Sequence, residues 1–268
     1  MHLEMSSKEI LQYTKRKVAF TITRNFVGRL ISYIYKDSIP SKHGLSIDTS
    51  NHRIDSQTKA SIFWGIYEGA EMRFVERYLP KDNDVIELGG SVGVISSLIR
   101  KKTNAQTRLF IVEADDELIP SIEKNVRTNN PGKEFRVIHG AISYSESDEK
   151  GNTLFYASDK NTGGKKYSNN KSSSNKLLKS VPSVKLRDII TNNNIENFAL
   201  VSDIEGAEAE LLANDHKILD KCNFIIIELH NTELEQEPVK IKELLDKLLT
   251  MGYKLLDSDG AAVFVLSK

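Results

Sequence analysis

Short apolar runs alternate with helix-like segments from Asp84 toward the C-terminus of the chain. Uninterrupted apolar runs of this kind are typical of strands that are buried on both faces. Helical spacing of apolar positions separates most of them, as in Glu117–Thr128 and Glu205–Leu212. The predicted strands are Val85–Leu88, Leu109–Val112, Phe135–Ile138, Ala199–Ser202 and Phe224–Glu228. Strands that alternate with helices predict an α/β fold in which helices cover both faces of a parallel sheet.

The C-terminal end of the chain has a different pattern. Two further strands are predicted near Lys254–Leu256 and Ala262–Leu266. The sequence DSDGA between them is typical of a tight turn. We therefore expect an antiparallel hairpin at one edge of the sheet.

The N-terminal part predicts a basic, amphipathic helix. Phe26, Leu30 and Ile34, with Val27 and Ile31, fall at helical spacing. From residue 11 to residue 36 the chain carries six basic residues and no acidic one, and Ser6 with Glu9 forms a candidate capping box upstream. The favoured interpretation is a helix that packs on its own domain. The alternative is a helix that contacts a membrane surface or another subunit.

These patterns divide the chain into an N-terminal helical arm and linker over residues 1–58 and a main domain over residues 59–268. A helical stretch is predicted over Lys59–Leu79, ahead of the first strand. Regular alternation stops between residues 143 and 180, where we expect a mobile polar insertion. Its lysines could form a lid over an anionic or sugar acceptor, or could contact only solvent. They are Lys160, Lys165, Lys166, Lys171, Lys176 and Lys179.

Composition excludes several classes of protein. The chain has 268 residues, 37 basic and 37 acidic, so its overall charge does not favour an anionic partner. Its single cysteine, Cys222, can form neither an internal disulfide nor a zinc cluster. No apolar stretch is long enough to cross a bilayer, and we expect a cytoplasmic protein.

The turn after the first predicted strand carries the first chemical signal. Its order, Glu87, Gly89, Gly90, Gly93, differs from the G-x-G-x-x-G pattern of dinucleotide-binding folds. Glycines at Gly89 and Gly90 would let a ligand approach the backbone, and Gly93 would permit close helix packing. A carboxylate at Glu87 would repel a pyrophosphate but suits a ligand with a cationic amino group. Glu113, at the end of the second strand, could accept both ribose hydroxyls of an adenosine, so S-adenosylmethionine is the expected cofactor.

The segments VIELGGSVGVIS, IVEADDELIPSIEKNV, VIHGAIS, VSDIEGAEAELL and FIIIELH resemble, in order and spacing, the FkbM-like S-adenosylmethionine-dependent methyltransferases. The resemblance extends from about Tyr67 to His230. Glu87, Gly90 and Ser91 replace the aspartate, alanine and asparagine usual in the family's first motif. The resemblance implies a Rossmann-like, seven-stranded class I methyltransferase sheet whose last strand inserts antiparallel, here with an N-terminal helical extension.

The same resemblance implies a set of cofactor-binding residues. The amino-acid end of the cofactor would lie against the first turn, the ribose against the end of the second strand, and the adenine edge after the third strand. In that order, the residues are Glu87, Gly89, Gly90, Ser91 and Gly93, then Glu113 and Ala114, then His139, Gly140 and Ala141.

The candidate catalytic residues follow the fourth and fifth strands, at the same carboxyl edge. They are Asp203, Glu205, Glu228 and His230. Glu205 and Glu208 are predicted on the opening turn of one helix, where Glu208 is as readily a structural acid as a functional one. Asp203 or His230 could act as a base toward a hydroxyl acceptor. A divalent cation held by Asp203 and Glu228 is possible but not favoured.

The predicted function is methyl transfer to a hydroxyl of a sugar, a glycan or a glycosylated small molecule, since the FkbM-like proteins are similar to enzymes that methylate such acceptors. The alternatives are methylation of a non-sugar natural product and a non-catalytic S-adenosylmethionine-binding module. No Asn/Asp-Pro-Pro-Tyr-like motif and no strongly basic face favours nucleic acid as a partner.

Overall fold

The computed structural model describes residues 18–19, 21–144, 151–158, 165–166 and 176–268. The chain forms two compact units, Met1–Gly69 and Ala70–Lys268. Each unit is described by itself. None of the helices in the described ranges combines the length and the apolar character needed to span a bilayer.

The first unit contains α2 (Asn25–Tyr35), α3 (Ser56–Trp64) and a small hairpin of β1 (Ser38–Pro40) and β2 (Ser46–Asp48). α2 matches the predicted apolar spacing, whereas the candidate capping box at Ser6 and Glu9 lies outside the described residues. Gly28 lets α2 lie against α3, because a Cβ atom there would be 1.6 Å from the carbonyl oxygen of Ser56.

The prediction of a single helical stretch over Lys59–Leu79 is wrong, because two helices, α3 and α4 (Gly69–Tyr78), cover this part of the chain. Asp55 caps α3 by accepting a hydrogen bond from the Thr58 N–H at 2.7 Å. α3 ends at Gly65, whose left-handed backbone stops the helix, and α4 begins after a short turn. The helical spacing continues across the break, so the pattern alone could not show it.

The second unit is built on a seven-stranded sheet. Its strands are β3 (Asp84–Leu88), β4 (Leu109–Glu113), β5 (Arg136–His139), β10 (Phe198–Ser202), β11 (Cys222–Glu228), β14 (Lys254–Ser258) and β15 (Val263–Ser267). Their order is β14-β15-β11-β10-β3-β4-β5. β5, β4, β3, β10 and β11 are parallel, and β15 pairs antiparallel with both β11 and β14. The α/β class, the seven-stranded sheet and the C-terminal hairpin are therefore as predicted.

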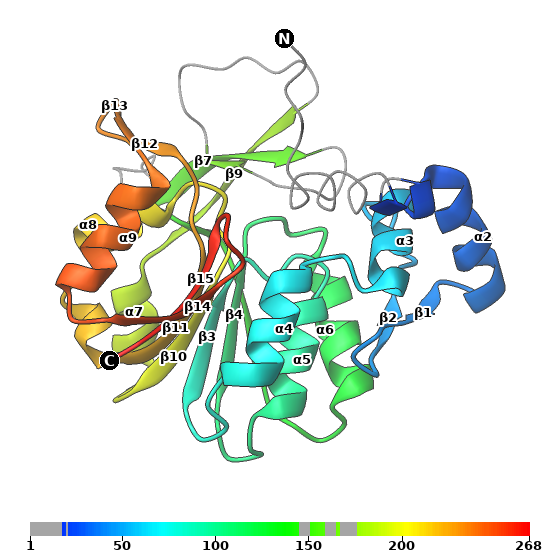
Figure 1. Cartoon of the computed structure of the whole chain (residues 1–268), viewed down its shortest axis with the longest axis horizontal. Helices are drawn as coiled ribbons and strands as arrows, with labels where there is room; N and C mark the ends of the chain where they lie inside the picture. Colours follow the sequence, from blue (N-terminus) through cyan, green and yellow to red (C-terminus); the bar gives the residue numbers. More distant parts are fainter. Residues whose placement is uncertain (1–17, 20, 145–150, 159–164, 167–175) are drawn as a thin grey trace, which may run out of the picture. The chain divides into compact units, whose positions relative to one another are not determined.

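Helices cover both faces of this sheet (Figure 1). One face carries α4, α5 (Val94–Lys102) and α6 (Ile119–Asn129), and the other carries α7 (Leu186–Asn192), α8 (Glu208–Asn214) and α9 (Ile241–Thr250). Alternate strand residues divide between the two layers. Ile86 and Leu88 of β3, for example, join one buried cluster with Leu211 of α8 and Leu244 of α9. A short 3₁₀ helix (Ile218–Lys221) and a hairpin of β12 (Thr232–Leu234) and β13 (Glu237–Val239) complete this unit.

The polar insertion contains more regular structure than the sequence predicts. A second sheet has the order β6-β9-β7-β8, from β6 (Ala141–Ile142), β7 (Asn152–Ser158), β8 (Lys165–Lys166) and β9 (Lys176–Val184). β7 pairs antiparallel along its whole length with residues 176–182 of β9, and the last two residues of β9 pair in parallel with β6. The sequence did not predict these strands, because their backbone groups are satisfied by cross-strand hydrogen bonds that polar side chains do not signal. The mobility of the insertion stays a prediction. Residues 145–150, 159–164 and 167–175, with most of the lysine-rich run, lie outside the described residues.

Candidate active site

The carboxyl ends of β3 and β10 meet at the centre of the sheet. The chain runs from β3 to β4 and β5 on one side, whereas β10 and β11 lie on the other, so the topological switch point lies between β3 and β10. Open α/β sheets bind ligands at this point. The Asp203 N–H donates to the carbonyl of Leu88 at 2.9 Å, which joins the ends of the two strands. A predicted catalytic acid therefore adjoins the predicted cofactor turn.

The glycine turn, Gly89–Gly93, is shaped by its protein neighbours. The N–H groups of Gly89 and Gly90 donate to the carbonyl of Val112 at 2.9 and 3.1 Å. A Cβ atom at Gly89, which has φ of 92°, would lie 2.0 Å from the Asp203 carbonyl oxygen, and one at Gly90 would lie 2.5 Å from Ile111 Cγ2. These glycines are therefore required by close protein neighbours, and the approach of a ligand to their backbone stays a prediction.

Gly93 has the role predicted for it. A Cβ atom there would lie 2.8 Å from Cα of Ile122, and its φ of 82° is in the left-handed region. Gly93 also forms the N-terminal cap of α5. It therefore lets α5 pack closely against α6.

Glu87 is a buried carboxyl group without a hydrogen bond. Only 1% of the residue is exposed, and within the described part of the chain neither carboxyl oxygen has a hydrogen-bond partner. Burial raises the pKa of Glu87 to about 8. The nearby Ser96 hydroxyl opposes this rise without a hydrogen bond of good geometry, and the charge of Glu113 adds to it. Two unsatisfied oxygens beside the glycine turn fit the cationic amino group of S-adenosylmethionine.

Glu113 connects two loops at the same edge. Its Oε2 accepts a hydrogen bond from the Ser91 N–H and its Oε1 accepts one from the Asp115 N–H, both at 2.7 Å. Burial raises the pKa of Glu113, while the N–H groups of Asp115, Ser91 and Ala114 oppose the rise. Each carboxylate oxygen keeps a further lone pair that a ribose hydroxyl could use. The ribose role of Glu113 and Ala114 stays a prediction.

The residues predicted at the adenine edge lie beside the insertion. His139 ends β5 and is exposed, whereas Gly140 and Ala141 are buried. The Gly140 N–H donates to the Glu113 carbonyl at 2.8 Å, and a Cβ atom at Gly140 would lie 2.6 Å from the Pro182 carbonyl oxygen. Gly140 therefore lets β9 cross the end of β5 at close range. Contact with adenine stays a prediction for these three residues.

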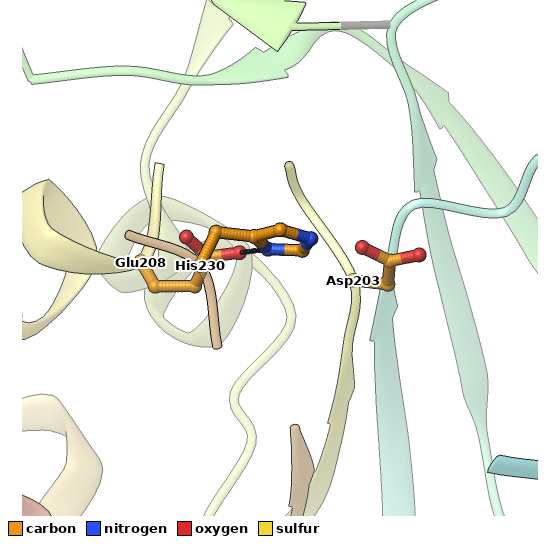
Figure 2. A group of neighbouring side chains, drawn as sticks. All are labelled: Asp203, Glu208 and His230. Carbon is orange, nitrogen blue, oxygen red and sulfur yellow. Dashed lines mark hydrogen bonds and ion pairs between the residues drawn. The ribbon is translucent and has the colours of Figure 1, made fainter. Parts of the chain in front are cut away.

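Glu208, which is buried, and His230, which is partly buried, form a pair on the other side of the switch point. His230 Nδ1 lies 2.9 Å from Oε1 of Glu208, whose side chain has no exposed surface. Figure 2 shows the imidazole between Glu208 and Asp203, with its other ring nitrogen on the side of Asp203. Burial lowers the pKa of His230, but the hydrogen bond to Glu208 and the charges of Glu208, Glu205 and Asp203 outweigh it and raise the pKa to about 9. The surrounding acids therefore favour the protonated form of His230.

The other predicted acids surround the outer nitrogen of His230. His230 Nε2 lies 3.7 Å from a carboxylate oxygen of Glu205 and 3.7 Å from one of Glu228. Burial and the charge of Glu205 raise the pKa of Asp203 to about 7, against the effect of His230. Burial and the charges of Asp203 and Glu71 raise the pKa of Glu228 to about 8. The structure therefore brings the four predicted catalytic residues together.

Sequence reasoning missed one member of this cluster. Glu71 on α4 is buried, and its side chain forms a hydrogen bond with that of Glu228. A hydrogen bond between two carboxyl groups requires a proton on one of them, and burial raises the pKa of Glu71. Glu71 precedes the first strand, outside every motif, so no local signal identified it. The acid–histidine cluster comprises Glu71, Asp203, Glu205, Glu208, Glu228 and His230.

The position of Glu205 differs from the prediction. α8 begins at Glu208, and Glu205 lies in the preceding loop with φ of 50°, followed by Gly206 with φ of 110°. Two left-handed residues cannot continue into a helix, which explains the later start. Thr232 donates a hydrogen bond to the Gly206 carbonyl at 2.6 Å and holds this loop against the chain that follows β11.

Lys179 is the lysine of the insertion whose contacts are described. Its ammonium group lies 2.9, 2.9 and 2.7 Å from carboxylate oxygens of Asp115, Asp116 and Glu117, next to Glu113. Burial lowers the pKa of Lys179, but its hydrogen bonds to these three acids outweigh burial and raise it. Lys179 therefore anchors β9 to the loop after β4. A lid formed by the other lysines stays a prediction.

A metal ion at the cluster stays a possibility that the sequence raised. One ligand atom each from Asp203, Glu208 and His230 lies within 4.8 Å of the others. The imidazole stands between the two carboxylates, and its Nδ1 already pairs with Glu208 (Figure 2). This order fits a histidine oriented by one acid and facing another more closely than it fits three ligands around one ion.

Several solved structures are similar to the chain. They include a protein of the NADB-Rossmann superfamily from Streptococcus agalactiae (12% identity, 74% of this chain and 67% of that chain, TM-score 0.43). Aeropyrum pernix fibrillarin in complex with S-adenosyl-L-methionine has 12% identity over 71% of this chain and 69% of that chain, with a TM-score of 0.41. The METTL16 methyltransferase domain has 13% identity over 91% and 79%, with a TM-score of 0.45. Such low identities and TM-scores carry no information on the substrate.

The comparison with protein families identifies the family of the chain, which the similar solved structures do not. A search of curated proteins found no match. The family described as Methyltransferase FkbM domain matches residues 87–255, which is well over half of the chain and includes the glycine turn and most of the acid–histidine cluster. The chain therefore belongs to the FkbM methyltransferase family and is an S-adenosylmethionine-dependent methyltransferase.

Proposed function

We propose that this methyltransferase transfers the methyl group to a hydroxyl of a sugar, a glycan or a glycosylated small molecule. The observation that carries the proposal is the acid–histidine cluster at the carboxyl ends of β10 and β11, beside the glycine turn. Five carboxyl groups and one imidazole gather there. The proposal concerns the acceptor, because the methyltransferase activity follows from the family.

The charge of the cluster favours a hydroxylated acceptor that is neutral or cationic. Carboxylate oxygens accept hydrogen bonds and donate none when ionised, so they suit the several O–H groups of a sugar. A phosphate or an anionic nucleic-acid backbone would face the same carboxylates and be repelled. Burial, and then the negative charge of neighbouring acids, already raise the pKa values of Asp203 and Glu228. The cluster therefore supports a sugar over a nucleic acid.

In this proposal, Asp203 is the base that removes the proton of the acceptor hydroxyl. A hydroxyl is a weak nucleophile, and a base in hydrogen-bond reach removes its proton as it attacks. The pKa of Asp203, raised to about 7, matches a base that works near neutral pH. The surrounding acids favour the protonated form of His230, so the imidazole supplies positive charge to these carboxylates and is the weaker candidate for the base. Glu208 holds the imidazole in place through Nδ1.

The cofactor side of the site uses other residues. Glu87 would hold the amino group of S-adenosylmethionine, and Glu113 would bind the ribose hydroxyls. When bound, the cofactor supplies a methyl group that its sulfonium activates for displacement. Because the loops after β3 and β10 contact each other at Gly89 and Asp203, cofactor and acceptor would be held by adjacent segments, which favours alignment.

The test is methyl transfer from labelled S-adenosylmethionine to a panel of free sugars, nucleotide-linked sugars, neutral glycosides and short RNA. The expected result is label on a sugar hydroxyl, identified by mass spectrometry, and its loss in Asp203→Asn. Label on RNA alone, or on a natural product without a sugar, would overturn the proposal. Tight binding of the cofactor with no transfer to any acceptor would favour a non-catalytic binding module.

A further inference from the structure

One face of α2 presents large apolar side chains to solvent. Phe26, Leu30, Tyr33 and Ile34 are 66%, 56%, 84% and 59% exposed. Their spacing places them on one side of the helix, while Gly28 and Ile31 on the other side are buried. Large apolar side chains that adjoin one another on a surface mark a site of interaction, whereas single exposed ones do not.

Basic residues surround this apolar face. Arg24 precedes α2, Arg29 lies beside the apolar side chains, and Lys36 caps the end of the helix. All three are exposed, and none forms an ion pair with a described residue. α2 itself contains no acidic residue. Asp37, the acid that follows α2 in the chain, pairs with Lys59 at 2.6 Å, so no described acid that adjoins α2 in sequence pairs with these three basic residues.

A shallow surface hollow adjoins the same residues. Arg29, Tyr33 and Lys36 line it, together with Ile34, Ser32, Asp37 and Ser56. The hollow therefore places cationic groups next to the exposed aromatic and aliphatic side chains. An anionic headgroup at the hollow and acyl chains against the apolar face would match both chemistries.

We propose that α2 binds the surface of a bilayer that contains anionic lipids. The apolar face would enter the boundary between headgroups and acyl chains, and the basic residues would attract the negative surface. The helix is too short to span a bilayer, so contact would be peripheral. Such contact would hold the enzyme at a membrane whatever its acceptor, so the inference does not depend on the proposed function.

The test is co-sedimentation of the full chain with large vesicles of phosphatidylcholine alone and of phosphatidylcholine with phosphatidylglycerol. We expect binding to the anionic vesicles, little to the neutral ones, and weaker binding as salt increases. Emission of the single tryptophan, Trp64, gives a second readout in the same unit. Absence of binding to anionic vesicles would overturn the inference.

Matched variants separate the contribution of the apolar side chains to vesicle binding from that of the basic residues. Phe26→Ser with Leu30→Ser should lower the partition coefficient by at least about tenfold, because apolar side chains no longer enter the boundary. Leu249→Ser, an exposed leucine of α9, is the control and should have no effect. Arg24→Gln with Arg29→Gln should lower binding by about fivefold for each cation removed. Lys240→Gln with Lys242→Gln is the control, because it makes the same change of charge at exposed positions outside α2. This double variant should bind the vesicles as the wild type does.

Other partners of the face give different results. If a second copy of the chain covers it, the wild type will be a dimer in analytical ultracentrifugation and Phe26→Ser with Leu30→Ser will be a monomer. If the face packs within the protein, the same variant will lower the melting temperature, whereas removal of exposed side chains should leave it unchanged. Either outcome would overturn the inference. An unchanged circular dichroism spectrum and an unchanged emission spectrum of Trp64, which lies in the same unit as α2, will show that the variants are folded.

Discussion

Nδ1 of His230 lies 2.9 Å from Oε1 of Glu208, a fully buried carboxylate at the start of α8. The pair joins the loop after β11 to the helix after β10. β10 borders the switch point of the sheet, and β11 is the next strand beside it. Because the carboxylate raises the pKa of His230, the protonated form of the imidazole is favoured among these acids. Asp203 faces this pair (Figure 2), and under the proposed function it is the base.

Replacing Glu208 by glutamine should lower the pKa of His230 from about 9 toward its ordinary value, because the amide keeps an acceptor oxygen but removes the charge. We expect turnover near pH 8 to fall by about tenfold or more, as a neutral imidazole no longer balances the acids. The measurement is an NMR titration of the histidine rings, with kcat against pH. Glu243→Gln on the exposed surface of α9 is the control, and an unchanged titration of His230 would contradict the assignment.

Asp203→Asn should separate binding from chemistry. Cofactor affinity should stay within a few fold, while kcat should fall by about 10²–10⁴, the range for a lost base. Calorimetry gives the affinity and the labelled-cofactor assay gives kcat. If Asp203 instead holds a divalent cation, a chelator will reproduce the loss in the wild type and magnesium will reverse it. Full turnover by the asparagine variant would refute both roles.

Glu87 should make cofactor binding depend on pH. Its pKa of about 8 means that the carboxyl is largely protonated at pH 7 in the free protein, whereas a cationic amino group prefers the ionised form. We expect affinity for S-adenosylmethionine to increase from pH 6 to about pH 8 and then to level off. Glu87→Gln should bind more weakly and without this dependence. Calorimetry across this range is the measurement, and parallel curves for both proteins would disprove the role.

The same carboxyl should affect stability with a defined sign. The pKa of Glu87 is raised from 4.5 to about 8 in the folded protein, so the folded chain binds the proton more tightly than the unfolded chain. Stability therefore decreases as pH rises between these two values. Glu87→Gln removes this contribution, so its free energy of unfolding, relative to wild type, should increase with pH. Urea titrations at pH 5, 7 and 8 measure the difference, and a constant difference would contradict the burial argument.

Glu113→Gln should weaken both the cofactor and the fold. The glutamine keeps one acceptor oxygen, so one of the two N–H groups of Ser91 and Asp115 loses its partner. We expect a loss of about 1–3 kcal/mol in cofactor binding and a measurable fall in the free energy of unfolding. Glu123→Gln on the exposed side of α6 is the control. Unchanged affinity with reduced stability would show that Glu113 only connects the two loops.

Gly89→Ala and Gly132→Ala form a matched pair. Both glycines have positive φ, 92° and 75°, but a Cβ atom at Gly132 would meet nothing within 4 Å, whereas one at Gly89 would lie 2.0 Å from the Asp203 carbonyl oxygen. Gly132→Ala should cost about 1–2 kcal/mol from backbone strain alone. Gly89→Ala should cost several kcal/mol more, or prevent folding, because the loops after β3 and β10 must separate. Chemical denaturation measures both, and equal losses would show that the loops are not in contact.

The sequence by itself determined the sheet and the places where chemistry could occur. Uninterrupted apolar runs marked the strands of the central sheet, because burial on both faces leaves no polar alternation. Glu113 and Asp203 directly follow two of those runs, and Glu87 is the last residue but one of a third. Parallel strands bring their carboxyl ends to one edge of the sheet. The local pattern was therefore enough to predict that these acids lie at one site.

Only the tertiary structure decided which of these groups meet and what charge they carry. Glu71 joins Glu228 from a helix that precedes every motif, and Glu208 pairs with His230 across two loops. The left-handed backbone at Glu205 and the close approach of the Asp203 carbonyl to Gly89 likewise depend on chain segments that are far away in the sequence. The physical reason is that pKa values and close contacts depend on burial and on non-local neighbours, which local spacing does not encode.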